Sequence, residues 1–346
     1  SLSATAAASF PPLTDEQGEA RLRDLVRMAG VDHDRVVESD GPLPPWSDYA
    51  ALYGRSPRIS GLGTCGTFRD SVPSHRRSVG PAGMFNTGTN LLNEMLLHCR
   101  VAAGGRASFR ESIFGVRWQV PWGKHTPASW RGRHVSEIDR KRGSDPPNAT
   151  EVLPVAIIKD PYGWMGSMCR HTYSVNFRKS SIHCPNLVGI EGDKNKKVGE
   201  PYMAQVRYSK FNVTKHASLA HIWNDWNGAY HDVADYPRLV VRYEDLLLHP
   251  ETVTKAICDC AGGTLRTGPG GFALQARSVK GDERAHWGSS GLIAALRRYG
   301  SEERRVEGYD EADLRYAAEH LDGELMKAYG YSHPTLSRAW KGQTAK

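Results

Sequence analysis

The chain has 346 residues, of which 39% are hydrophobic and 24% charged, with a formal net charge of +7 at pH 7. This composition suits a globular protein with a sizeable core. No run approaches the roughly 18 apolar residues that span a bilayer, so we expect no membrane insertion. The positive charge favours anionic ligands. Because the basic residues are dispersed rather than gathered in one tract, we expect no nucleic-acid partner.

Six cysteines are too few for a disulfide scaffold in a chain of this length. Their spacing includes no pair of CxxC motifs, so no metal site is predicted. We expect buried or half-buried free thiols, with one disulfide between Cys169 and Cys184 left open. Two sequons, at Asn148 and Asn212, matter only if the chain enters the secretory pathway.

The first 77 residues are predicted to be an N-terminal extension and an irregular segment. Residues 15–29 place apolar side chains at helical spacing, which predicts a short amphipathic helix. Residues 40–78 are rich in Gly, Pro, Ser and Arg and have no period, so we expect no regular structure there.

Short apolar runs then alternate with amphipathic stretches along residues 78–335. This alternation predicts a three-layer α/β/α domain with a central, mainly parallel sheet. The polar, Lys-rich stretch 185–212 is predicted to be an exposed insertion, and 336–346 a tail. The expected strands are 79–85, 153–159 and 238–242, and the expected helices are 90–99, 162–171, 215–232, 250–260 and 311–329.

The first candidate site is the turn between the strand at 79–85 and the following helix. Backbone N–H groups and the positive end of a helix bind an anion at such a turn. Residue 89 is Thr where the Walker A consensus requires Lys, which disfavours a magnesium–nucleotide kinase. An ordinary helix N-cap fits the same letters equally well. The candidate ligand residues are Asn86, Thr87, Gly88, Thr89 and Asn90.

The second candidate site follows the strand at 153–159. Lys159 stands at the carboxyl end of this strand, where open α/β sheets bind ligands. Ser167 comes eight residues later, about one turn into the next helix. Together they can hold one phosphate, although a surface lysine and a solvent-facing serine are the simpler reading of an isolated pair.

These segments, in this order and at this separation, resemble the sulfotransferase family that depends on 3′-phosphoadenosine 5′-phosphosulfate (PAPS). The family patterns [KR]-[ST]-G-T-[TSN] and [RK]-D-P-x-x-[WR]-x-x-S correspond here to residues 86–90 and 159–167. Residues 241–246 (VRYEDL) resemble a third family element. The resemblance implies a P-loop-like fold, PAPS as donor, no metal, and adenosine 3′,5′-bisphosphate (PAP) as product. It departs at Asn86, where the family usually has Lys or Arg.

Between the two phosphate segments, residues 118–127 are predicted to be a strand that breaks into a loop and carries the catalytic pair. Sulfuryl transfer needs a base near neutral pH and cations that stabilise the departing phosphate. We assign His125 as the base, and Lys124 as the cation that replaces the missing loop lysine. A solvated loop pair is the alternative. The rival bases are His98, His171 and Glu111.

The resemblance also implies a basic, Gly-containing loop for the adenine, and Lys280 with Gly281 is the candidate. A plain surface loop matches equally well. The acceptor is a small molecule or a carbohydrate, bearing a hydroxyl or an amine. Cytoplasm and Golgi lumen stay open as locations, as does the oligomeric state. An ATP-dependent P-loop kinase and a non-catalytic protein that binds anions or sulfated glycans are the alternative functions.

Overall fold

The computed structural model describes residues 10–32, 34, 41–102, 114–136, 148–178, 184–192, 196–266, 268, 271–277 and 291–335. The candidate base Glu111, the candidate adenine-binding residues Lys280 and Gly281, and the tail 336–346 lie outside these residues. All six cysteines and all other candidate site residues lie within them.

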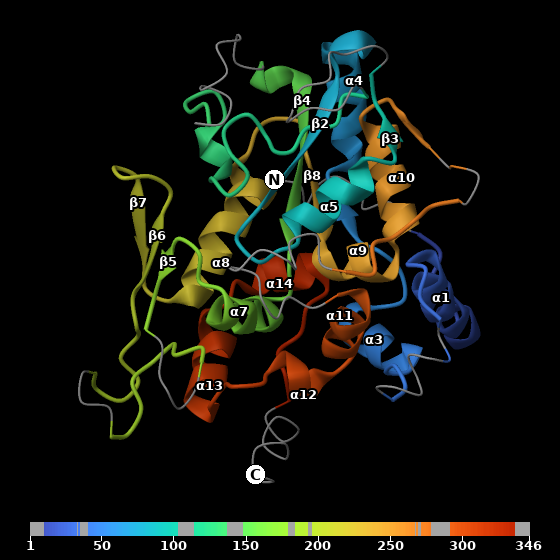
Figure 1. Ribbon diagram of the computed structural model, residues 1–346. Helices are drawn as coiled ribbons and strands as arrows, with labels where there is room; N and C mark the ends of the chain where they lie inside the picture. The colour runs from blue at the N-terminus through green and yellow to red at the C-terminus, as the bar shows by residue number, and fades with distance from the viewer. Residues whose placement is uncertain are drawn as a thin grey trace.

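A four-stranded sheet, in the order β1-β8-β4-β2, forms the centre of the molecule (Figure 1). The two pairings that join β2, β4 and β8 are parallel, whereas β1 is antiparallel at the edge beside β8. The predicted mixed α/β fold with a mainly parallel central sheet is therefore confirmed. The strands of this sheet are β1 (Ile59–Ser60), β2 (Ser78–Gly83), β4 (Val152–Ile158) and β8 (Leu239–Arg242).

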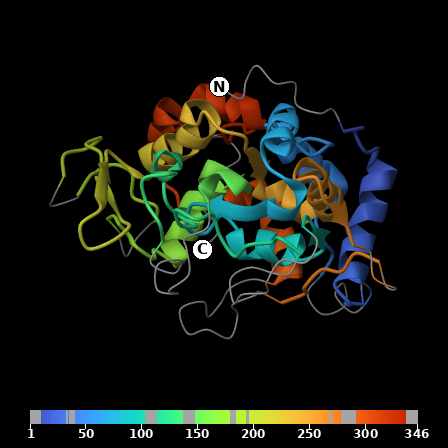
Figure 2. The same cartoon turned by 90° about the horizontal axis from the view of Figure 1, so that it is seen from above.

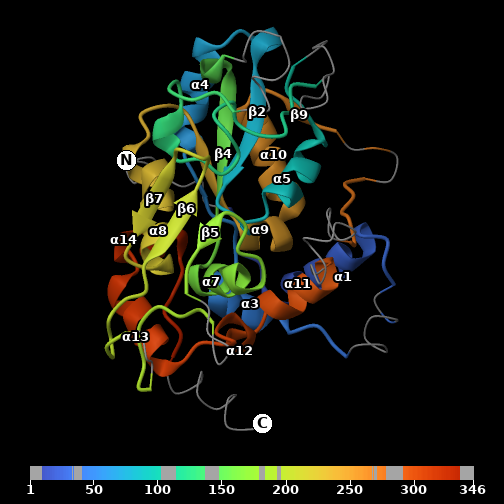
Figure 3. The ribbon, with the colours of Figure 1, turned by 60° about the vertical axis from the view of Figure 1, so that its left-hand side comes forward.

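Helices cover both faces of the sheet, because successive side chains of a strand point to opposite faces. In β4, Val155 and Ile157 join one apolar cluster, and Ala156 and Ile158 join the other. Figure 3 shows α5 and α10 on one side of the sheet and α8 on the other. The α-helices are α1 (Asp15–Met28), α3 (Trp46–Tyr53), α4 (Cys65–Ser71), α5 (Thr89–Leu96), α7 (Pro161–Arg170), α8 (Leu219–Gly228), α9 (Tyr243–Leu248), α10 (Pro250–Cys260), α11 (Leu292–Tyr299), α12 (Glu302–Arg305), α13 (Glu311–His320) and α14 (Gly323–Tyr329).

The segment expected to be irregular, 40–78, contains α3, β1 and α4. Trp46 and Tyr49 of α3 are fully buried in the core, so tertiary packing rather than sequence period holds this helix in place. Two expected helices were also too long. The predicted helix 311–329 breaks before Asp322, whose Oδ1 caps the first turn of α14. The predicted helix 215–232 begins only at Leu219.

A second, antiparallel sheet of three short strands projects from one edge of the molecule, opposite α1 (Figure 2). It consists of β5 (Val175–Asn176), β6 (Ala204–Arg207) and β7 (Val213–His216). The expected exposed insertion, 185–212, is therefore only partly exposed. Leu187 and Val188 are buried in the core, whereas Phe211 at the tip between β6 and β7 is 85% exposed.

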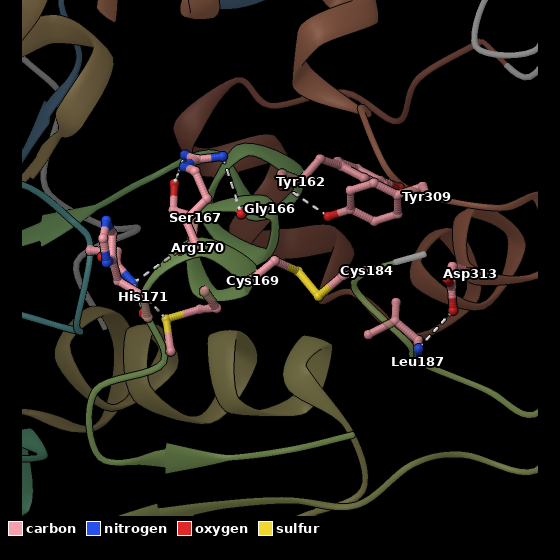
Figure 4. The surroundings of a disulfide bond; sticks show 12 residues. Tyr162, Gly166, Ser167, Cys169, Arg170, His171, Cys184, Leu187, Tyr309 and Asp313 are labelled. Atoms are coloured by element: carbon pink, nitrogen blue, oxygen red, sulfur yellow. Dashed lines mark hydrogen bonds between the residues drawn. A yellow bond between two sulfur atoms is a disulfide. The ribbon is translucent and has the colours of Figure 1, made fainter. Parts of the chain in front are cut away.

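The expectation of free thiols was wrong, because all six cysteines form disulfides. Cys169 pairs with Cys184 beside the end of α7 (Figure 4). The other two bridges are Cys65–Cys260 and Cys99–Cys258. Both end on the last turn of α10, and the second joins it to the short pair of β3 (Cys99–Arg100) and β9 (Thr264–Leu265). The spacing of the cysteines in sequence did not reveal this proximity in space.

Candidate functional site

The turn between β2 and α5 forms the first candidate site. Gly88, the N-cap of α5, has φ 86° and provides no side chain for the first helical amides. An added Cβ would lie 2.5 Å from Cδ2 of Tyr243, so only glycine fits here. The Thr87 hydroxyl donates to Met84 O at 2.8 Å and tightens the turn. The structure therefore does not have an ordinary N-cap, in which a Thr or Asn side chain would cap this helix.

Asn86 serves a different purpose from the family's loop lysine. It adopts a left-handed conformation with φ 63°, which asparagine tolerates better than most residues. Its Nδ2 donates to His171 O at 2.7 Å and contacts Ser167 O at 3.4 Å. The side chain thus fastens the loop to the C-terminal end of α7 and brings no charge to the site.

Lys124 brings a cation to the same loop. Its Nζ donates to Asn90 Oδ1 at 3.0 Å and lies 3.5 Å from the centre of the Trp118 ring. The side chain is buried, so its charge interacts more strongly than a solvated one would. The segment that carries it is not the expected strand. Residues 117–124 run beside β2 with intermittent backbone hydrogen bonds, among them Gly83 N to Lys124 O at 2.9 Å.

His125 is held in one tautomer by the end of β2. Its Nδ1 lies 2.6 Å from the carbonyl oxygen of Gly83. Because a carbonyl only accepts, Nδ1 carries the proton, and in the neutral ring Nε2 is the basic nitrogen. The ring packs on Phe85, with centroids 4.4 Å apart, and Phe85 in turn stacks on Tyr173. The orientation of His125 is therefore fixed on both sides.

The loop, Lys124 and His125 line one cavity of about 660 Å³. The sequence predicted these residues for one site, and the structure brings them together. Of the five loop candidates, all but Thr87 line this cavity, since Thr87 is buried in the turn. The cavity continues along α5 past Glu94 to His98, and Gln275 and Arg277 face it from another segment.

Lys159 and Ser167 form a second cluster next to this cavity without lining it. Lys159 Nζ donates to Ser167 Oγ at 2.9 Å and to Asn86 O at 3.2 Å. The ammonium also lies 4.6 Å and 4.9 Å from the ring centres of Tyr243 and Tyr299. Tyr243 also lines the cavity, so its ring lies between the loop and the Lys159 cluster, the two candidate phosphate sites.

Arg170 belongs to this cluster and was missed from the sequence. Its Nη2 donates to Ser167 Oγ at 2.9 Å (Figure 4). Burial, and then the charge of Arg298, lower the pKa of the Arg170 guanidinium. Arg298 itself pairs with Glu307 at 3.3 Å, so Lys159 and Arg170 are the two cations that share Ser167 Oγ. The signal was present, because Arg170 follows Ser167 by three residues and so lies on the same face of α7.

Acidic groups behind the site join the ends of β4 and β8. Asp160 forms a buried ion pair with Arg305 at 2.7 Å and caps α7 through Gly163 N. Glu244 accepts from Asp160 N at 3.0 Å and from the Tyr331 hydroxyl at 2.9 Å. Burial and the Asp160 carboxylate raise the pKa of Glu244 to about 7. These contacts fix the strand ends that carry Lys159 and Tyr243.

The rival bases have different surroundings. His98 lines the cavity, but its Nε2 lies 3.1 Å from Ala273 O, so the opposite ring nitrogen carries the lone pair. His171 ends α7, and its carbonyl accepts from Asn86. Among the described residues that line the cavity, Glu94 is a carboxylate that sequence reasoning did not single out.

Comparison of the chain with protein-family models, with curated proteins and with solved structures finds no match. Within the described part of the chain, no helix is long and apolar enough to cross a membrane. The same residues include no group of three or more His, Cys, Asp or Glu side chains that could hold a metal ion. A functional reading therefore depends on the geometry of the cavity and its neighbouring cluster.

Proposed function

We propose that the protein is a sulfotransferase, which moves the sulfuryl group of PAPS to a hydroxyl or amine of a carbohydrate or small-molecule acceptor. The observation that carries the proposal is the position of Lys124, whose buried ammonium contacts Asn90 on the anion-type loop while His125 occupies the same cavity. Lys124 thereby supplies the positive charge that the family's loop usually carries as Lys or Arg at the position of Asn86.

In this proposal the loop amides and Lys124 hold the 5′-phosphosulfate. The acceptor oxygen attacks the sulfur, the bond from sulfur to the bridging phosphate oxygen breaks, and PAP leaves with the electron pair. His125 Nε2 takes the proton of the acceptor, since its Nδ1 is occupied by Gly83 O. Lys124 stabilises the charge that develops on the departing phosphate. Lys159, Ser167 and Arg170 hold the 3′-phosphate.

The disulfides favour an oxidising compartment for this reaction, because reducing cytosol opposes such bonds. The sequon residues Asn148 and Asn212 are both exposed, as glycosylation in the secretory pathway requires. We therefore favour a luminal enzyme over a cytoplasmic one. A luminal location also favours a carbohydrate among the two acceptor classes.

The test is a calorimetric titration with PAP and, separately, with ATP and Mg²⁺. We expect the wild type to bind PAP without metal and more tightly than ATP. Lys124→Met and Lys159→Met should each weaken PAP binding by roughly tenfold or more, because each removes a charge-assisted contact to a phosphate. Lys255→Met, on the exposed face of α10, is the control and should bind like the wild type.

A preference for ATP and Mg²⁺ would replace the sulfotransferase with a kinase. Salt-sensitive binding of a sulfated glycan, with no binding of PAP, would indicate a non-catalytic anion-binding protein.

A further inference from the structure

The hairpin of β6 and β7 has an open strand edge with exposed apolar side chains. Among the described strands β7 pairs with β6 alone, so its other edge is an edge of the sheet. Phe211 at the hairpin tip is 85% exposed, and Val213 in β7 is 39% exposed. Lys210 and Lys215 bring charge to the hairpin, but they leave these two apolar side chains uncovered. Such an edge can pair with the same edge of a second molecule unless something protects it.

A sequon lies at the start of this edge. Asn212 directly precedes β7, and Thr214 completes the Asn-Val-Thr tripeptide. Asn212 is exposed, and its Nδ2 donates to Ser209 Oγ at 2.8 Å. Because Nδ2 carries two protons, a sugar that replaces one of them leaves the other for Ser209. The backbone carbonyl of Asn212, which accepts from Tyr208 N at 2.9 Å, is not involved. The turn can therefore carry a glycan and keep its hydrogen bonds.

The sequon at Asn148 has different surroundings. Asn148 precedes the short 3₁₀-helix η5 (Ala149–Glu151), where its Oδ1 accepts from Thr150 N at 3.0 Å. A glycan at this position would cover no exposed apolar strand edge, which makes Asn148 a matched control. The exposed large apolar side chains of the described residues lie elsewhere in the sequence, at Leu97, Tyr173, Val198, Met203, Phe211, Val213 and Val233.

We propose that Asn212 carries an N-linked oligosaccharide, and that this oligosaccharide prevents the β7 edges of two molecules from pairing. A bulky, polar glycan beside Phe211 and Val213 keeps a second strand away from them. The inference depends on passage through the secretory pathway, which the disulfides favour, and not on sulfuryl transfer.

The donor of the glycan would be a lipid-linked oligosaccharide diphosphate. Nδ2 of Asn212 attacks the first carbon of the oligosaccharide, the bond from that carbon to the diphosphate oxygen breaks, Nδ2 loses one proton, and the lipid diphosphate leaves. In the folded protein the Thr214 hydroxyl lies 2.8 Å from His216 Nε2. The transfer therefore precedes the pairing of β7, while the sequon is still accessible.

The experiment expresses the chain with a secretion signal in eukaryotic cells. Peptide-N-glycosidase converts a glycosylated asparagine to aspartate, and we expect peptide mass spectrometry to find this conversion at position 212. In sedimentation, Asn212→Gln should have a larger average mass than the wild type, and the difference should grow with concentration. Asn148→Gln should sediment like the wild type. Addition of Val213→Lys to Asn212→Gln should restore the wild-type mass, because a charge on an edge strand opposes pairing.

An unmodified Asn212 in the secreted protein would overturn the site. Equal sedimentation of Asn212→Gln and wild type at every concentration would overturn the shielding role. If Asn212→Gln is not secreted, an endoglycosidase that trims the glycan of the folded wild type to one sugar makes the same comparison. A titration with PAP separates this inference from the proposed function, since a glycosylated chain that binds no PAP would sink the sulfotransferase alone.

Discussion

His125 and Lys124 are adjacent in sequence, yet different parts of the fold hold their side chains. The Gly83 carbonyl binds Nδ1 of His125, and Asn90 on α5 binds Nζ of Lys124. The sequence places a histidine and a lysine together in this segment, and the proposed sulfuryl transfer needs a base and a cation. Their convergence on one loop could not, since it depends on backbone contacts between residues 117–124 and β2.

Replacement of His125 by asparagine should separate binding from catalysis. An asparagine amide can still donate to the Gly83 carbonyl, but the variant lacks the basic nitrogen. We expect PAP affinity within a few-fold of the wild type and kcat lower by roughly 10²-fold or more. Labelled PAPS with a panel of sugar and phenol acceptors measures the transfer. His75→Asn, at an exposed histidine, is the control, and equal kcat for both variants would exclude His125 as the base.

The strand, turn and helix formed by β2, residues 84–88 and α5 were predicted within one to three residues of their ends. The apolar runs of the strand and the helix determine their element types, and Gly88 determines where the turn lies. The short elements α3 and α4 could not be predicted, because each is stabilised by burial against residues far away in the sequence. Residues 118–127 were predicted to be a strand that breaks into a loop, but the segment makes only intermittent hydrogen bonds to β2 and forms no regular strand.

Gly88→Ala should damage the loop more than its size suggests. The added Cβ meets the Tyr243 ring, and φ 86° is strained for alanine, so we expect a loss of about 1–3 kcal/mol in unfolding free energy. Because Tyr243 must move, PAP binding should also weaken by roughly tenfold. Gly166→Ala on α7 is the control. Its Cβ would meet nothing within 4 Å, and alanine favours a helix, so stability should be unchanged or higher. Normal PAP affinity in Gly88→Ala would contradict the assigned role of this turn.

At the scale of the whole molecule, the buried carboxyl of Glu244 links stability to pH. Its pKa in the folded protein is about 7, above the ordinary value of 4.5. Its contribution is therefore complete below pH 4.5 and is lost as the pH rises through 7, on the order of 3 kcal/mol in all.

Glu244→Gln should remove this part of the pH dependence. A glutamine can accept from Asp160 N through its carbonyl, and its amide can donate to the Tyr331 oxygen. In urea unfolding, we expect the wild type to lose more stability than the variant between pH 5 and pH 8. Glu324→Gln should follow the wild type. Parallel curves for Glu244→Gln and wild type would show that Glu244 is already ionised in the folded protein.

The bridge between Cys65 and Cys260 closes a covalent ring across 195 residues of sequence separation. The anion-type loop, Lys124, His125 and the Lys159 cluster up to Tyr243 all belong to this ring. A pulling force applied to the two ends of the chain therefore passes through the bridge and bypasses these residues, whereas the cavity walls formed by residues 273–277 and 291–295 lie outside the ring. Reduction of this bridge and of the Cys99–Cys258 bridge inside it, with the 15-residue separation of Cys169–Cys184 still closed, would release about 610 Å of extra contour length, at roughly 3.4 Å per residue.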